Sequence, residues 1–265
     1  MFRRVSLLVA LACGVSAGGL AGCGAKRVAL PTGAGTPFPD AGPAYEAAVK
    51  ECRSVRTIRV TLGLSGRAGS TTLRGNVDAG FEAPEKIRLE GRHPLGRPVF
   101  ILASPGSQTT LYMPRENRVM QNASATDIVE ALVGLKLAPH DLRTLVSGCG
   151  FEVGPPSDGR QYADGLVAVT VGGATTYLRQ SQGRWQVAGS VRPPLSVLYS
   201  DVVSGRPSTL RLQASGSPAA DVTVRLSDMN INVPLEPEVF AVDVPAGAQP
   251  LTIDELRRAG PLGGA

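Results

Sequence analysis

Few residues of this chain have the types and spacing that catalysis requires. Residues 14–18 read Gly-Val-Ser-Ala-Gly, a serine-hydrolase pattern, but no strand precedes them, so the exposed turn that such a serine needs cannot form. The two histidines, His93 and His140, share no metal-ligand spacing with a cysteine. His140 and Asp141 are neighbours in an expected helix and should point to different faces, a poor geometry for an orienting pair. The sequence therefore predicts a protein without catalytic residues, metal or cofactor, and not an enzyme.

The four cysteines carry more information than the histidines. Cys13 lies in an apolar N-terminal run that we expect to be removed, and Cys23 follows that run, which leaves Cys52 and Cys149. In an oxidising compartment these two would form a disulfide, closing a long loop and stabilising the fold by about 4–5 kcal/mol in the chain-entropy model. The alternative is a pair of buried free thiols, because Cys52 lies on an apolar helical stripe.

Residues 1–22 have the layout of a secretory signal peptide. Two arginines at positions 3 and 4 precede an apolar segment, residues 5–15, that is too short for an ordinary membrane span. Residues 20–23, Leu-Ala-Gly-Cys, resemble the bacterial lipobox, in which the thiol of Cys23 receives a diacylglyceryl group. An ordinary secretory signal with an incidental cysteine is the alternative.

Lipidation at Cys23 would hold the chain at a membrane. Two or three acyl chains together anchor a protein stably, whereas one chain gives only marginal binding. Gly24 stands where many inner-membrane lipoproteins carry a retaining aspartate. By that analogy we expect a lipid-anchored protein of the outer membrane.

The remaining residues are expected to form one α+β domain. Residues 23–43 are rich in proline and glycine and read as a flexible tether, and a helix over 44–54 presents one apolar stripe. Period-two alternation then predicts an antiparallel meander. The expected strands are 56–64, 72–81, 86–90, 99–103, 108–113, 165–171, 175–180, 185–191, 195–202, 209–214 and 222–228. Residues 240–244 read as a further edge strand, and the tail at 246–265 carries a short helix at 252–258 before a frayed end at 260–265. This C-terminal part is expected to be either an extra edge strand or a cover for the pocket.

A stiff loop with an apolar tip separates the strands at 86–90 and 99–103. Pro94 and Pro98 fix their φ angles and offer no backbone donor, so the strand ladder must stop there. Between them Leu95 has no neighbour that can bury it locally. An exposed leucine on a stiff loop is suited to insertion into an apolar medium. The alternative is an ordinary turn residue, or one covered by a neighbouring loop.

The arrangement of two strands joined by a loop with Pro94-Leu95-Gly96 resembles the LolB family of outer-membrane lipoprotein receptors. A second match resembles the lid of that family: a helix over 127–135 with Ser124 as its N-cap, then a helix begun by Pro139. The resemblance covers roughly residues 20–200. It implies a LolA/LolB-like fold, a strongly curved antiparallel half-barrel of about 10–11 strands with helices packed on its concave face as a lid. The expected lipid-binding domain spans residues 44–245.

The resemblance also implies an apolar cavity for acyl chains. Each CH₂ group exposed to water costs about 0.8 kcal/mol, and an aliphatic cavity removes that cost reversibly. The expected lining on the strands is Leu62, Leu64, Ile87, Leu89, Phe100, Leu102, Leu111 and Met113, and on the lid Ile128, Leu132 and Leu142. The alternative is a packed core, because periodicity does not distinguish an interior from a cavity wall.

The implied function is that of a receptor facing the periplasm, which takes lipoprotein acyl chains from a LolA-type carrier and inserts them into the outer membrane with Leu95. Two alternatives stay open: a related lipoprotein that handles another envelope lipid, and a purely structural lipoprotein with a filled core. The charge balance requires no polyanionic partner. Without the two arginines of the signal peptide it is 25 basic against 22 acidic residues, about +3. We therefore expect no nucleic-acid partner, and a monomer.

Overall fold

The structure is a computed structural model that describes residues 30–31, 33–92, 98–106, 108–121, 123–216 and 219–259. Within these residues it contains one sheet of 15 strands and four α-helices. The strands are β1 Thr36–Pro37, β2 Thr57–Ala68, β3 Thr71–Glu82, β4 Lys86–Arg92, β5 Phe100–Ser104, β6 Thr110–Met113, β7 Arg118–Gln121, β8 Pro156–Gln161, β9 Val167–Val171, β10 Ala174–Ser181, β11 Arg184–Arg192, β12 Leu195–Val203, β13 Arg206–Ala214, β14 Ala220–Ile231 and β15 Gln249–Pro250. The helices are α1 Ala41–Arg53, α2 Ala125–Val133, α3 Pro139–Ser147 and α4 Ile253–Ala259, with a 3₁₀ turn, η1, at Pro237–Phe240.

Two meanders, β2 to β7 and β8 to β14, form most of the sheet, and the short strands β1 and β15 are its two edges. The meanders are joined side by side by the antiparallel pairing of β14 with β2, in which Val224 lies opposite Leu64. Among the described residues, every strand pair is antiparallel except β15 with β7. In the described residues the strand order runs from β1 at one edge to β15 at the other, so the sheet is open. Its half-barrel curvature stays a prediction.

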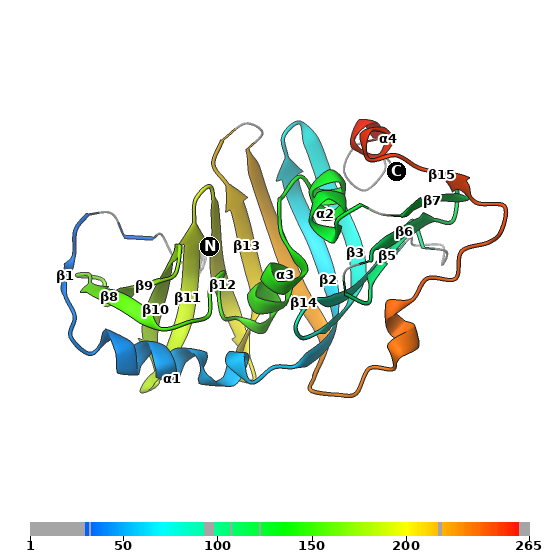
Figure 1. The fold of residues 1–265 in the computed structure, drawn as a ribbon. Helices are drawn as coiled ribbons and strands as arrows, with labels where there is room; N and C mark the ends of the chain where they lie inside the picture. The colour runs from blue at the N-terminus through cyan, green and yellow to red at the C-terminus, as the bar shows by residue number, and fades with distance from the viewer. Residues whose placement is uncertain are drawn as a thin grey trace, which may run out of the picture.

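The helices α1, α2 and α3 cover one face of this sheet (Figure 1). α1 packs against β8 to β11, whereas α2 and α3 lie in front of β13, β14, β2 and β3. The opposite face is crossed by the segment that contains η1. There Arg88 Nη1 donates hydrogen bonds to the carbonyls of Val239, at 3.2 Å, and Ala241, at 2.9 Å. Phe240 is buried under the Lys86 ammonium, 5.5 Å from the ring centre.

Two apolar clusters fill the helical side. The main core joins the inner faces of β2 to β6 and β12 to β14 with α2, α3 and α4. The smaller α1 core joins α1 with β9 and β10 and contains both Cys52 and Cys149. These cysteines form a disulfide with a Cα–Cα distance of 5.6 Å, which links α1 to the segment after α3.

The sheet is larger than the 10–11 strands expected from the sequence. The additional strands are β1, β7, β8 and β15, which are short or polar and pair through their backbones, so side-chain periodicity does not reveal them. Residues 36–37 pair with β8 and α1 begins at Ala41, inside the expected tether. The expected edge strand at 240–244 is wrong, because η1 ends at Phe240, which is buried, and residues 241–245 form neither helix nor strand. Sheet and helices thus extend beyond residues 44–245 on both sides.

Candidate functional site

A small apolar cavity of about 80 Å³ lies between the sheet and the helices α2 and α3. Every lining side chain is a leucine, a valine or a phenylalanine, so the wall offers no polar group. The lining residues are Leu62, Leu64, Val77, Leu89, Phe100, Val129, Leu132, Val133, Leu135, Leu137, Leu142, Leu145, Val146, Leu210, Leu212, Val222 and Val224. Such a wall can hold hydrocarbon but no charged or hydrogen-bonding group.

The strand part of the wall depends on register across three strands. Leu62 on β2 lies opposite Val77 on β3, and Leu64 lies opposite Val224 on β14. Phe100, at the start of β5, needs a glycine opposite it. A Cβ atom on Gly91 would lie 2.4 Å from the Phe100 ring, so any other residue at this position would displace the ring.

The helix α2 is capped at both ends by its own sequence. Ser124 Oγ accepts a hydrogen bond from the backbone N–H of Asp127 at 3.1 Å, as the sequence predicts. At the other end Gly134 adopts the left-handed conformation, with φ 71°, and approaches β2 so closely that a Cβ there would lie 2.7 Å from Ala68 Cβ. Among the described residues, α2 makes no side-chain hydrogen bond or ion pair to a strand, so apolar contacts hold it on the sheet.

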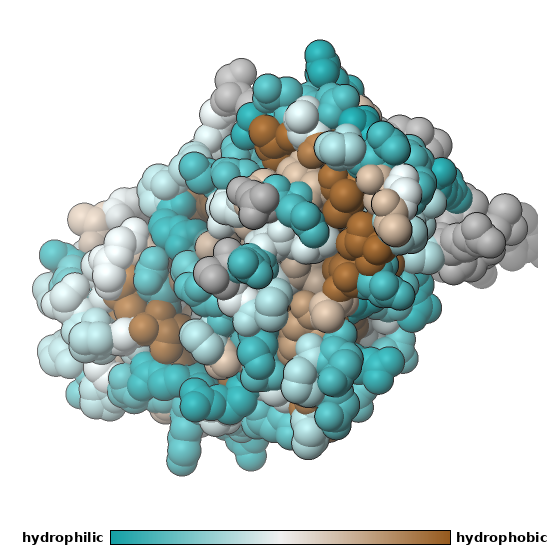
Figure 2. Space-filling view, turned by 45° about the vertical axis from the view of Figure 1, so that its right-hand side comes forward, coloured by the Kyte–Doolittle hydropathy of each residue, from teal (hydrophilic) through white to brown (hydrophobic). Residues whose placement is uncertain are grey.

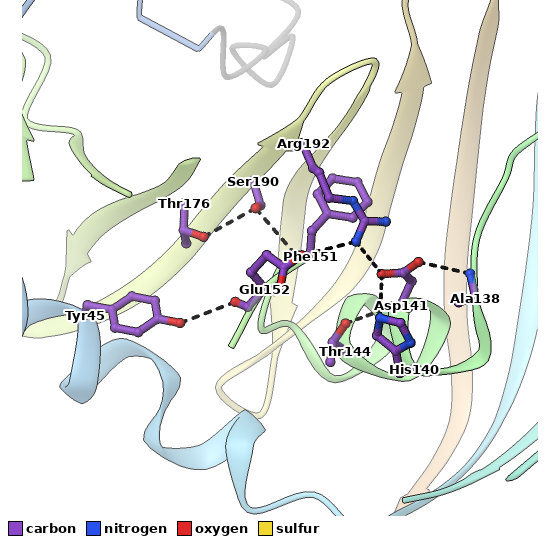
Figure 3. Close-up of polar contacts among 10 residues, drawn as sticks. All are labelled: Tyr45, Ala138, His140, Asp141, Thr144, Phe151, Glu152, Thr176, Ser190 and Arg192. Carbon is purple, nitrogen blue, oxygen red and sulfur yellow. Dashed lines mark hydrogen bonds and ion pairs between the residues drawn. The ribbon is translucent and has the colours of Figure 1, made fainter. Parts of the chain in front are cut away.

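The helix α3, in contrast, is fixed by a buried ion pair (Figure 3). Arg192 Nη1 on β11 lies 2.7 Å from Asp141 Oδ1, whose side chain is only 5% exposed. The other carboxylate oxygen of Asp141 accepts from the backbone N–H of Ala138 at 3.0 Å and caps the helix. The guanidinium also lies 4.8 Å from the centre of the Phe151 ring and 3.4 Å from Glu152 Oε1. The bond to Asp141 is the main cause that raises the pKa of Arg192.

Two further contacts tie the end of α3 to the sheet. The buried hydroxyl of Tyr199 on β12 donates to the Leu145 carbonyl at 3.0 Å and accepts from the Gly150 N–H at 3.2 Å. Burial raises the pKa of Tyr199, so the hydroxyl stays protonated and can keep donating. The disulfide at Cys149 then connects the same segment to α1.

The expectation that His140 and Asp141 point apart is wrong. His140 Nε2 lies 3.3 Å from Asp141 Oδ1, because the carboxylate turns back toward the N-terminus of α3 (Figure 3). That oxygen also receives the Arg192 guanidinium, and the imidazole is half exposed. The His140–Asp141 contact is therefore part of the polar cluster around Asp141 that holds α3 on the sheet.

The structure divides the expected lining residues into two groups. Leu62, Leu64, Leu89, Phe100, Leu132 and Leu142 line the cavity. Ile87, Leu102, Leu111, Met113 and Ile128 are buried in the main core but are not part of the wall. The sequence did not predict the lining residues of β13 and β14, because alternation predicts these strands but not that β14 pairs with β2 and β13 with β14. The full set of lining residues that were not predicted is Val77, Val129, Val133, Leu135, Leu137, Leu145, Val146, Leu210, Leu212, Val222 and Val224. Cys23, Pro94, Leu95 and Gly96 lie outside the described residues.

The cavity is far smaller than an open ligand pocket, because side chains fill most of the space under the lid. Pockets for drug-sized ligands measure roughly 300–1,000 Å³. At about 80 Å³ this cavity admits a short hydrocarbon fragment, and a full acyl chain requires a wall to move. Figure 2 shows an elongated apolar strip within an otherwise largely hydrophilic face of the molecule.

Two larger hollows, of about 980 and 890 Å³, are open surface grooves. Their walls include charged side chains, Arg59, Asp78, Arg88 and Glu90 in the first and Glu51, Arg179, Arg184 and Arg206 in the second, which do not suit hydrocarbon. The described residues contain no group of three or more His, Cys, Asp and Glu side chains placed to hold a metal ion. None of the helices within the described ranges has the length and apolar character of a membrane span.

Comparisons with known proteins find similarity only among solved structures, since no protein-family model and no curated protein matches. A LolA superfamily protein from Nitrosomonas europaea is 13% identical, with a TM-score of 0.46, over 78% of this chain and 98% of its own. A DUF1329 family protein from Desulfovibrio piger is 12% identical, with a TM-score of 0.48, over 77% and 98%. A domain described as an outer membrane lipoprotein-sorting protein, from Vibrio parahaemolyticus, is 10% identical, with a TM-score of 0.45, over 76% and 97%.

LolA-superfamily and lipoprotein-sorting proteins are thus structural neighbours of this chain, and LolB is not named among these three. Identities and TM-scores of this size do not transfer a function. The function is therefore argued from the cavity.

Proposed function

We propose that this chain binds acyl chains, of lipoproteins or of other envelope lipids, in the cavity between the sheet and the helices α2 and α3. The observation that carries the proposal is the wall itself, which is wholly apolar on both the sheet side and the lid side. Hydrocarbon gains about 0.8 kcal/mol per CH₂ on leaving water, so such a wall favours an acyl chain and rejects its headgroup.

The finer form of the proposal is a LolB-like receptor without enzymatic activity. Cys23 would carry the lipid anchor at the outer membrane, a LolA-type carrier would deliver lipoproteins, and Leu95 would help insert them into the bilayer. This form rests on the sequence resemblance around Pro94-Leu95-Gly96 and on the lipobox. It predicts that Leu95→Glu keeps cargo binding but impairs membrane insertion, and normal insertion by that variant would remove the role of Leu95.

One observation favours a different function, a structural envelope lipoprotein. The cavity of about 80 Å³ is small enough to be an ordinary packing defect between the lid and the sheet. If that is its nature, no lipid will bind with useful affinity.

Lipid co-purification separates these functions. The full chain carrying Cys23→Ser, which has no acyl chain of its own, is purified without detergent, and its bound lipids are extracted and identified by mass spectrometry. We expect about one acyl lipid per chain. A chain that carries no lipid and does not bind an added fluorescent fatty acid would overturn acyl-chain binding and leave the structural role.

A matched pair of variants locates the binding site. Val133→Phe fills the cavity from α2, whereas Val203→Phe makes the same change on β12 at a side chain that is 62% exposed and does not line the cavity. We expect Val133→Phe to weaken fatty-acid binding roughly tenfold and Val203→Phe to leave it unchanged. Equal effects of the two substitutions would place the lipid elsewhere. A carrier-to-receptor transfer assay then distinguishes lipoprotein cargo from another lipid.

A further inference from the structure

The C-terminal helix α4 packs on α2, on the side of the main core next to the cavity lid (Figure 1). Leu256 of α4 is 1% exposed, and Leu251, just before the helix, is also buried. Both belong to the same apolar cluster as Ile128 and Val129 of α2. The C-terminal tail, for which the sequence predicts a short helix and, as one alternative, a cover for the pocket, therefore packs on the lid helix α2.

This tail is attached to the sheet by very little backbone pairing. β15 pairs with β7 in parallel over two residues, and Leu251 N–H donates to the Val119 carbonyl at 2.7 Å. Parallel pairing is slightly weaker per residue than antiparallel pairing, and β15 is an edge strand. Detaching the tail therefore breaks only a few backbone hydrogen bonds.

One arginine clamps the two parts of the tail together. Arg118 Nη2 on β7 lies 2.6 Å from the Pro250 carbonyl and 2.8 Å from Glu255 Oε2 in α4. The same carboxylate accepts from the Thr252 N–H at 2.9 Å and caps the helix. The Thr252 backbone bond, followed by the Arg118 bond, lowers the pKa of Glu255 to about 2, so the clamp stays charged at neutral pH.

The contrast between the two lid helices then determines which wall can move. α3 is held by the Arg192–Asp141 pair, by Tyr199 and through the disulfide. Within the described residues, α2 is held on the sheet and on α4 by apolar contacts without a side-chain hydrogen bond or ion pair. Apolar contacts are not directional, so α2 can slide or lift and make new contacts with a hydrocarbon guest without leaving a polar group unpaired.

We infer that α4 is a strap that holds α2 closed over the cavity, and that lifting the strap lets the cavity enlarge to admit an acyl chain. The inference rests on the proposed acyl-chain binding. If only the unstrapped state binds, the apparent affinity equals the intrinsic affinity multiplied by the fraction of chains in that state. Weakening the strap must then tighten binding, which is the opposite of what damage to a binding site does.

The test uses Leu256→Asn, which weakens the packing of α4 on α2, and Arg258→Asn as its control, because Arg258 is an exposed residue of the same helix. The full chain with Cys23→Ser is titrated with cis-parinaric acid, a fluorescent fatty acid, and amide hydrogen exchange is followed in α2 and α3. We expect Leu256→Asn to lower the apparent Kd roughly three- to tenfold and to speed exchange in α2 but not in α3. The control should leave both unchanged.

The outcomes separate the strap from the proposed function. Probe binding by the parent chain with the same Kd and the same α2 exchange in Leu256→Asn would overturn the strap and keep the function. Faster α2 exchange with no probe binding by any variant would support the strap and overturn the function. If Leu256→Asn does not fold, Arg118→Gln makes the same test, because it removes the clamp and leaves the apolar contacts in place.

Discussion

The two helices over the cavity are attached to the same sheet by different kinds of interaction, polar for α3 and apolar for α2. α3 reaches the sheet through a carboxylate that is 5% exposed, a buried tyrosine hydroxyl and a segment closed by a disulfide. α2 reaches it through leucine, isoleucine and valine side chains, and in the described residues its side-chain hydrogen bonds are confined to its own N-cap.

Buried polar contacts accept one geometry, whereas apolar contacts accept many. Displacing α3 would separate the Asp141 carboxylate from the Arg192 guanidinium at a site where Asp141 is poorly solvated, which is costly. Displacing α2 exchanges one apolar surface for another. A lid made of one fixed and one adaptable helix can therefore open without unfolding. The contrast also predicts which helix each substitution should destabilise.

The disulfide should give the largest effect. Replacing both Cys52 and Cys149 by alanine opens a loop with a sequence separation of 97 residues and should lower the free energy of unfolding by about 2–5 kcal/mol. Urea denaturation of the oxidised protein and of the double variant measures this difference. Amide exchange should become faster around α1 and α3 rather than in α2. An unchanged denaturation midpoint would show that the crosslink does not anchor α3.

Breaking the ion pair of α3 should give the next largest effect. Arg192→Gln leaves the buried carboxylate of Asp141 without its cation and should cost about 2 kcal/mol, since Arg192 is itself 25% exposed and partly screened by water. The matched control is Arg160→Gln, whose partner Asp158 is 58% exposed, and which should cost less than about 0.5 kcal/mol. Urea denaturation of both variants tests this, and equal losses would mean that burial does not strengthen the Arg192 pair.

Removing the cap of α2 should give the smallest effect. Ser124→Ala deletes the acceptor for the Asp127 N–H and should cost about 1 kcal/mol. Faster amide exchange in α2, with α3 unchanged, is the expected signature. Ser227→Ala, an exposed serine on β14, is the control that should change neither. If α3 exchanged as fast as α2 in Ser124→Ala, the two helices would open as one unit and the contrast between them would be lost.

Local signals made much of this architecture predictable from the sequence. Alternation predicted the strands β2 to β6 and β9 to β14, and the N-cap Ser124, the terminal Gly134 and the helix-starting Pro139 predicted the lid helices. These signals act between residues a few positions apart, so no knowledge of the fold is needed to interpret them. The same reasoning missed β1 and β15, because a strand of two residues has no period.

The sequence by itself determined the local features of the fold. These are the apolar faces of the strands and lid helices, the helix caps, and two cysteines that can form a disulfide. Which of those apolar residues surround a cavity was decided only when β14 paired with β2 and brought Val224 beside Leu64. The anchors of the lid were decided in the same way. Arg192 meets Asp141 across 51 residues of sequence, and Arg118 meets Glu255 across 137. Such contacts form only when the whole sheet is assembled, and the local sequence around a side chain does not indicate a partner so distant in the chain.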